Sequence, residues 1–162
     1  MDSASERFFD TYGEYRNAIL AALGQAQRSI AIFDPDLRGC GLENRAGTAR
    51  LESLCLRSPH RDALRILLHS TALIEKECPR MIHLLARFAH RASVRTTDPG
   101  SRNWTQPFLV ADGELAVMRF HLDLPRGKIC AAESRTIAYL DTQFETMWLN
   151  GKSCAIGTPL GI

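Results

Sequence analysis

The spacing of apolar residues changes between helical and strand-like several times along the chain. A helix is predicted over residues 5–24, because apolar side chains recur there at steps of three and four residues. This stripe consists of Phe8, Tyr12, Tyr15, Ile19 and Leu23. Ser3 and Glu6 have the spacing of a capping box at the start of this helix, and Gly24 is predicted to end it.

Strands are predicted where short runs of β-branched and apolar residues stand between turn residues. These runs cover residues 29–33, 63–69, 93–97, 108–111, 115–122 and 129–132. Further helices are predicted over 45–56, on either side of the break at Cys78 and Pro79, and over 135–150 with Ser134 as the cap.

The order of these elements predicts the fold class. Helices and strands alternate in the first half, which is typical of parallel strands joined by crossover helices. Asp112 and Gly113 stand between two apolar runs, which predicts an antiparallel hairpin in the second half. We therefore expect an α/β fold with a mixed, mainly parallel sheet flanked by helices on both faces. We expect residues 1–152 to form a single domain and residues 153–162 a C-terminal tail.

Size and composition fit an ordinary globular domain. The chain has 162 residues, of which 45% are hydrophobic and 23% charged, and its formal net charge is +2. That charge is too small to indicate nucleic-acid binding by itself. The apolar runs are too short to cross a bilayer, and the N-terminal segment MDSASERFFD is polar and acidic, unlike a secretory signal. We therefore expect a cytoplasmic protein with no membrane partner.

Motifs for several common chemistries do not occur in the sequence. It has no Walker A loop and no GxSxG nucleophile elbow, and the GxG that follows Arg38 lacks the third glycine of a dinucleotide-binding loop. The five cysteines include no CxxC pair, and we expect them to be free thiols. His83 and His90 are too widely spaced to share an ion, so neither a metal site nor a cofactor is predicted.

The segment WTQPFLVADG, residues 104–113, carries the most informative pattern. It resembles the phospholipase D motif HxKx4D, which lies on a strand, has its Asp at the following turn and is followed by GSxxN. With Asp112 on the Asp of that motif, Thr105 stands in place of the nucleophilic His. Pro107 then stands in place of the phosphate-binding Lys, and the GSxxN frame falls on RFHLD, residues 119–123.

The resemblance extends over nearly the whole chain. RSIAIFD resembles the opening strand of the family, LRILLHS its second strand, and FETMWLNG the closing helix of one half. The chain is most similar to an uncharacterised bacterial domain family of this degenerate type, whose members occur alone or beside acetyltransferase domains. The resemblance therefore implies a single phospholipase D-like half. Thr105 has no adjacent base and Pro107 no charge, so we expect no phosphodiester cleavage by this motif.

A set of polar residues remains at the predicted strand ends. Side chains alternate between the two faces of a strand, so over residues 115–123 we expect Arg119, His121 and Asp123 to line one face toward the end of the strand. Ligands of open α/β sheets gather at the carboxyl ends of strands, and arginine binds oxyanions through its planar fork. We predict a phosphate- or anion-binding site made of Arg119, His121 and Arg126, with His69 and Asp112 nearby.

A structural interpretation of the same residues stays open. Arg119 would pair with a carboxylate and His121 would bind a backbone carbonyl, because buried polar groups need partners. His69 would be a satisfied residue at a strand end. The hairpin turn by itself explains Asp112.

Three functions follow from these patterns. The leading hypothesis is a non-catalytic phospholipase D-like module that binds a phosphorylated small molecule or a partner domain. Family analogy suggests an acetyltransferase domain as that partner, and a homodimer is expected because two halves pair in the related enzymes. The second is a phosphodiesterase or phosphohydrolase, in which His121 is nucleophile or acid, Arg119 holds the phosphate, and two copies of His121 meet across a dimer axis. The third is nucleic-acid binding through a basic surface.

Overall fold

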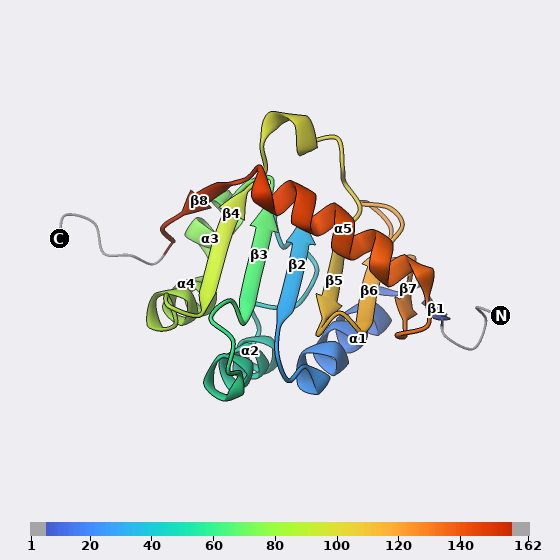
Figure 1. The fold of residues 1–162 in the computed structure, drawn as a ribbon, viewed down its shortest axis with the longest axis horizontal. Coiled ribbons are helices and arrows are strands. Elements are labelled where there is room, and N and C mark those ends of the chain that lie inside the picture. Colours follow the sequence, from blue (N-terminus) through green and yellow to red (C-terminus); the bar gives the residue numbers. More distant parts are fainter. Residues whose placement is uncertain (1–5, 157–162) are drawn as a thin grey trace.

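An eight-stranded mixed sheet supports the helices in the part of the chain that the structure describes. The computed structural model describes residues 6–156 and orders the strands β1-β7-β6-β5-β2-β3-β4-β8 (Figure 1). The strands are β1 (Glu6–Phe9), β2 (Ile30–Asp34), β3 (Leu64–Leu68), β4 (Ala92–Thr96), β5 (Phe108–Ala111), β6 (Leu115–Arg119), β7 (Gly127–Cys130) and β8 (Lys152–Cys154). The helices are α1 (Tyr12–Gln25), α2 (Arg45–Arg57), α3 (Ala72–Glu77), α4 (Pro79–Arg87) and α5 (Arg135–Leu149), with a 3₁₀ turn at Pro99–Ser101.

The α/β class and the mixed sheet are confirmed, but the balance of strand directions differs from the expectation. Of the seven strand pairings among the described residues, β2 with β3 and β3 with β4 are parallel and five are antiparallel. The expectation of a mainly parallel sheet was therefore wrong. The connections through α2 and through α3 and α4 join neighbouring parallel strands, whereas β5, β6 and β7 follow one another through short loops and therefore pair antiparallel.

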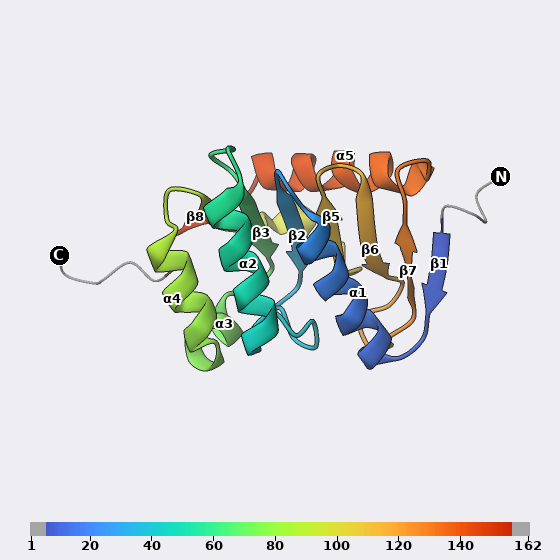
Figure 2. The same cartoon turned by 90° about the horizontal axis from the view of Figure 1, so that it is seen from below.

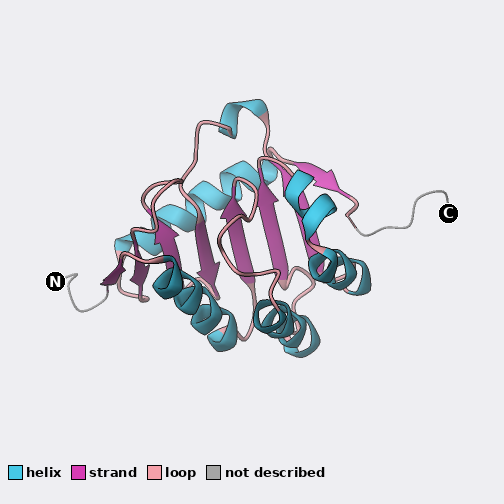
Figure 3. Cartoon of the chain, turned by 180° about the vertical axis from the view of Figure 1, so that it is seen from behind, coloured by secondary structure: helices cyan, strands magenta, loops and turns pink. Residues whose placement is uncertain are grey.

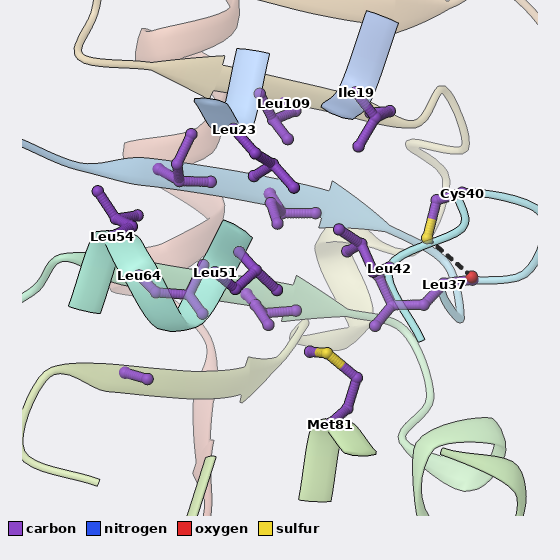
Figure 4. Close-up of a cluster of buried hydrophobic side chains, with 14 of the residues drawn as sticks. Ile19, Leu23, Leu37, Cys40, Leu42, Leu51, Leu54, Leu64, Met81 and Leu109 are labelled. Atoms are coloured by element: carbon purple, nitrogen blue, oxygen red, sulfur yellow. Dashed lines mark hydrogen bonds between the residues drawn. The ribbon is translucent and has the colours of Figure 1, made fainter. Parts of the chain in front are cut away.

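Helices cover both faces of the sheet unequally. Figure 2 shows α1 to α4 on one face and α5 alone on the other, and Figure 3 shows the four-helix face from behind. Each face has its own apolar core, because successive side chains of a strand point to opposite faces. In β2, for example, Ile32 packs under α1 and α2 while Phe33 packs under α5. The larger core includes Leu23, Leu51 and Met81 (Figure 4).

The start of the chain differs from the predicted helix over residues 5–24. Residues 6–9 form β1, which pairs with β7 in antiparallel register, and α1 begins only at Tyr12. Thr11 caps α1: its hydroxyl accepts from the backbone N–H of Glu14 at 3.1 Å and donates to the Glu14 carboxylate at 2.9 Å. The predicted capping residue Ser3 lies outside the described residues. The helical spacing of Phe8 was coincidental, since this side chain is 69% exposed.

The carboxylate of Glu6 fastens β1 to the body of the protein. Its Oε1 accepts from Lys128 Nζ at 2.9 Å, from Ser134 Oγ at 2.9 Å and from Thr136 Oγ1 at 3.3 Å. The contacts with Lys128 and Ser134 hold the pKa of Glu6 below its ordinary value. One side chain thus joins the first strand, β7 and the start of α5.

Local turn and cap signals were predicted correctly. Asp112 and Gly113 form the β5–β6 turn with positive φ at both residues, 56° and 68°, as a tight hairpin turn of this twist requires. Pro79 is the first residue of α4, and the hydroxyl of Ser134 accepts from the backbone N–H of Thr136 at the start of α5. No helix among the described residues is long and apolar enough to cross a bilayer.

Most strand boundaries differ from the predicted ones by one or more residues, and the end of β6 is the difference that bears on the site. β6 ends at Arg119, three residues before the predicted end at Leu122, and residues 120–126 form a loop. The alternation that grouped Arg119 with His121 and Asp123 therefore stops at Arg119. β8 was not predicted at all, because a three-residue run of mostly exposed side chains gives no periodic signal.

Candidate functional site

The carboxyl ends of β2, β3, β4 and β6 lie at one edge of the sheet, called here the carboxyl edge (Figure 1). Asp34 and Arg119 are the last residues of β2 and β6, and His69 follows β3 directly. The opposite edge carries the β5–β6 turn. This separation decides which of the polar residues can act together.

Pro107 lies between Asp34 and Arg119 at the carboxyl edge. The backbone N–H of Arg119 donates to the carbonyl oxygen of Pro107 at 3.0 Å, which extends the β5–β6 register by one pair. The β2–β5 register places Phe33 opposite Phe108, so Asp34 is the next neighbour of Pro107 on the other side. The alternation of side chains puts Asp34, Pro107 and Arg119 on the face covered by α1.

Arg119 is a buried cation held mainly by aromatic rings and carbonyl oxygens. Its side chain is among the most buried in the protein, and its guanidinium carbon lies 4.8 Å from the ring centre of Tyr15 and 5.7 Å from that of Tyr12. Nη1 donates to the carbonyl oxygen of Leu122 at 3.0 Å and more weakly to that of Leu124 at 3.5 Å. Among the described residues, Arg119 forms no ion pair within 4.0 Å, and its buried Nε has no hydrogen-bond partner.

Asp34 is the buried carboxyl group closest to Arg119 in the strand register. It is 2% exposed, and its Oδ1 accepts from the backbone N–H of Asp36 at 3.1 Å and of Leu37 at 2.9 Å. Burial raises the pKa of Asp34 to about 6, although these N–H groups and the charge of Arg119 act in the opposite direction. Burial, and next the charge of Asp34, raises the pKa of Tyr15 as well.

The loop after β2 is built tightly against α2. Leu37 has a φ of 75°, unusual for a residue with a Cβ, and its carbonyl accepts from Cys40 Sγ at 3.0 Å (Figure 4). A Cβ at Gly47, in the first turn of α2, would stand only 2.7 Å from the carbonyl oxygen of Gly41. This close approach holds the backbone of residues 41 and 42 against the first turn of α2.

A cavity of about 470 Å³ lies beside Arg119. It is lined by Tyr12, Arg16, Pro35, Asp36, Arg38, Gly39, Arg119, Leu122 and Asp123, and is called here the arginine cavity. Arg38 Nε lies 3.6 Å from the Asp36 carboxylate, a loose ion pair. Among residues 6–156, Arg16 and Asp123 make no ion pair or side-chain hydrogen bond.

The structure distributes the five predicted site residues over several places. Only Arg119 lines the arginine cavity. His121 is exposed in the loop after β6 and is not among the lining residues. Arg126 is exposed and lines a neighbouring hollow of about 380 Å³ beside Phe8 and Asp10.

His69 and Asp112 are engaged elsewhere. His69 Nδ1 lies 2.7 Å from Thr97 Oγ1, and Nε2 lies 2.6 Å from the carbonyl oxygen of Trp104. Because a carbonyl only accepts, Nε2 carries the proton in this pair. Asp112 lies at the opposite edge of the sheet.

Asp112 has a clear structural task. Its carboxylate accepts from the backbone N–H groups of Gln27 at 2.9 Å, Arg28 at 2.7 Å and Ser29 at 2.9 Å. Partial burial would raise the pKa of Asp112, but the three N–H groups and the charge of Arg28 outweigh it, so that the pKa is lowered. Asp112 thus fixes the chain between α1 and β2.

The positions that carry the reactive side chains of the phospholipase D motif show no catalytic arrangement. Thr105 is exposed and Pro107 is buried, and neither makes a side-chain hydrogen bond among the described residues. Within the same part of the chain, no three His, Cys, Asp or Glu side chains lie close enough to hold a metal ion. The arginine cavity itself has no Ser, Thr, Cys, His or Lys in its lining.

A comparison with protein families assigns the chain. A model of the family described as a domain of unknown function, DUF7931, matches residues 11–156. The chain belongs to the DUF7931 family. No curated protein matches it in sequence.

Solved structures show the fold of this DUF7931 domain. Nuc of Salmonella typhimurium, described as a phospholipase D family member, is 12% identical with a TM-score of 0.63, and the match covers 93% of this chain and 97% of Nuc. Phosphatidylserine synthase of Haemophilus influenzae Rd KW20 is 14% identical with a TM-score of 0.63, covering 94% of this chain and 40% of the synthase. At these identities the likeness shows a phospholipase D-like fold and no more.

TrmBL2, described as an archaeal chromatin protein with a novel mode of DNA binding, has the same fold. It is 15% identical with a TM-score of 0.67, and the match covers 93% of this chain. The DUF7931 chain spans 54% of the length of TrmBL2.

Sequence reasoning on this DUF7931 domain missed the residues that accompany Arg119. Arg38 had a signal, since it follows a strand end of the kind where ligands gather. Arg16 had none, because a charged residue on a helix surface is common, and Tyr12 was assigned to the apolar stripe of the first predicted helix. Their meeting depends on how α1 crosses the sheet. The result is a cavity lined by three guanidinium groups and two carboxylates, which can form ion pairs and hydrogen bonds with a polar ligand.

Proposed function

We propose that this DUF7931 domain is a non-catalytic phospholipase D-like module that binds a phosphorylated small molecule in the arginine cavity. The observation that carries the proposal is the state of Arg119. A buried guanidinium without a carboxylate within 4.0 Å, and with an unpartnered Nε, lines an open cavity. A buried charge of this kind is stabilised by an anion of opposite charge.

Phosphate is the anion that suits these donors best. Guanidinium groups bind phosphate oxygens through paired N–H donors, and Arg16 and Arg38 add two more of them to the same cavity. The rings of Tyr12 and Tyr15 hold the guanidinium of Arg119 in place, so little side-chain entropy is lost when a ligand binds. The cavity volume of about 470 Å³ lies in the range of small-molecule sites. This favours a small molecule over a partner domain as the ligand of this cavity.

The lining holds no Ser, Thr, Cys, His or Lys, which supports a binding role. Thr105 and Pro107 stand where the related enzymes carry His and Lys, and His69 uses both ring nitrogens in hydrogen bonds. The alternative with His121 as nucleophile needs that side chain beside Arg119, whereas His121 is not among the cavity residues. Nucleic-acid binding has less support, because Asp36 and Asp123 line the cavity and the net charge is only +2.

Calorimetric titration and thermal unfolding with inorganic phosphate and propyl phosphate test this function. We expect both compounds to raise the Tm of the wild-type protein and to bind it at constant ionic strength. Arg38→Gln and Arg16→Gln should each weaken binding about tenfold, the loss of a hydrogen bond to a charged group. These residues are exposed, so the variants should remain folded.

Arg61→Gln is the matched control. Arg61 is exposed in the turn before β3, at the edge of the sheet opposite the cavity, and its substitution removes the same charge. It should leave binding within twofold of the wild-type value. Failure of both phosphates to bind, or equal weakening by all three substitutions, would contradict the proposed function.

A further inference from the structure

The arginine cavity carries unpaired charges of both signs. Arg16 and Asp123 both line it, yet among residues 6–156 neither has an ion-pair partner, and they do not pair with each other. Asp36, in contrast, is engaged: its carboxylate accepts from the backbone N–H of Arg38 at 2.9 Å and lies 3.6 Å from Nε of the same residue. Asp123 is therefore the carboxylate in this cavity that is left for a ligand.

The position of Asp123 is coupled to that of Arg119. The carbonyl groups on either side of it, those of Leu122 and Leu124, accept the protons of Arg119 Nη1 at 3.0 and 3.5 Å. The contacts that bury the guanidinium thus also hold the loop that presents the carboxylate. A phosphate beside Arg119 is drawn to the arginines and repelled by Asp123, unless the same ligand offers Asp123 a hydrogen-bond donor.

From this arrangement we propose that the cavity selects phosphomonoesters that also carry an ammonium or hydroxyl group. The phosphoryl group lies against Arg119, with Arg16 and Arg38, and the donor group lies against Asp123. The inference rests on the proposed function, since it assumes that a phosphoryl group occupies the cavity. It adds the group that discriminates among phosphorylated compounds. An ammonium or hydroxyl donor forms a hydrogen bond with the Asp123 carboxylate, whereas an alkyl group leaves this carboxylate without a partner.

Three compounds of similar size test the inference in calorimetric titrations: O-phosphoethanolamine with an ammonium, glycerol 3-phosphate with hydroxyls, and propyl phosphate with neither. We expect at least one of the first two to bind the wild-type protein about tenfold more tightly than propyl phosphate does. The relative affinities of O-phosphoethanolamine and glycerol 3-phosphate show whether the site prefers an ammonium or a hydroxyl donor.

Asp123→Asn is the diagnostic variant, and Asp62→Asn the control that removes the same charge from an exposed turn at the opposite edge. Asp123→Asn should reduce the preference over propyl phosphate to about twofold or less while leaving propyl phosphate binding equal or tighter. Asp62→Asn should preserve the wild-type preference.

The outcomes separate the two proposals. Equal wild-type affinities for all three compounds, weakened by Arg38→Gln, would overturn the donor requirement and leave phosphate binding intact. A preference that survives Asp123→Asn would also overturn it, because the selecting group would then be another residue. If neither inorganic phosphate nor any of the three esters binds, the proposed function itself fails.

Discussion

The backbone N–H of Arg119 donates a 3.0 Å hydrogen bond to the carbonyl oxygen of Pro107, so these two residues face each other across β5 and β6. Pro107 is the position at which the phospholipase D resemblance places a phosphate-binding lysine. A positive charge is thus present one strand away from the expected one, on the same face of the sheet. The side chains of Arg119 and Asp34 lie on this same face. In the strand register only the short ring of Pro107 stands between them.

Substitution of Arg119 should destabilise the fold. Arg119→Met removes the cation nearest in register to Asp34 and leaves the carbonyls of Leu122 and Leu124 without their donor. We expect the free energy of unfolding to fall by about 2–4 kcal/mol in urea titrations. Arg126→Met, which replaces an exposed arginine in the loop after β6, should change it by less than about 0.5 kcal/mol. Equal effects of the two substitutions would show that the burial of Arg119 has no energetic consequence.

Stability should depend on pH through Asp34. Its pKa in the folded protein, about 6, exceeds the ordinary value of 3.8, so the folded state binds the proton more tightly. This proton contributes stability in full below about pH 4, and the contribution is lost as the pH rises through about 6. The total amounts to up to about 3 kcal/mol.

Urea midpoints of the wild-type protein and of Asp34→Asn between pH 4 and 7 isolate this contribution. The amide keeps an oxygen for the N–H groups of Asp36 and Leu37 but does not titrate. The difference in stability between variant and wild type should therefore grow in favour of the variant as the pH rises. A difference that stays constant over this range would exclude Asp34 as the titrating group.

Asp112 should matter for stability and not for ligand binding. Asp112→Ala leaves three backbone N–H groups, of residues 27–29, without their acceptor, and we expect a loss of about 2–3 kcal/mol by thermal or urea unfolding. Asp112→Asn keeps one acceptor and tolerates the positive φ of 56°, so its loss should be smaller. Phosphate affinity should be unchanged in Asp112→Asn, because the turn lies at the edge opposite the cavity. A weakened affinity in this folded variant would place Asp112 in the binding site after all.

Phosphodiester hydrolysis should not be detectable. The Thr105 hydroxyl makes no hydrogen bond to a base among the described residues, so bis(p-nitrophenyl) phosphate should remain intact in the presence of the wild-type protein and of Thr105→Ala alike. Turnover that disappears in Thr105→Ala would overturn the non-catalytic assignment. Turnover that disappears in His121→Ala would instead favour the enzyme with relocated residues.

The sequence predicted those parts of the fold that have local signals. The hairpin at Asp112 and Gly113, the helix start at Pro79 and the cap at Ser134 each depend on the backbone preferences of a few residues. β1 and β8 have no such signal. They are short edge strands whose identity depends on hydrogen bonds to β7 and β4, far away in the chain.

The site was predictable only in part for the same reason. Arg119 was singled out as a charged residue at a strand end, and the structure places it at the wall of a cavity. Its neighbours Arg16 and Arg38 come from a helix and a loop, and one-dimensional spacing does not bring them together. The grouping with His121 assumed that β6 continued, whereas Arg119 Nη1 binds the loop carbonyls that turn the chain away.

The attachment of the first strand has a consequence for biosynthesis. Residues 6–9 leave the ribosome well before the partners of Glu6 on β7 and at the start of α5, which are more than a hundred residues further along the chain. Until those partners emerge, this segment, in which Phe8 and Phe9 follow the charged Glu6 and Arg7, has no strand to join. The nascent chain therefore offers an unpaired β-segment with two phenylalanine side chains to chaperones, or to neighbouring chains on the same messenger, until residue 136 has emerged.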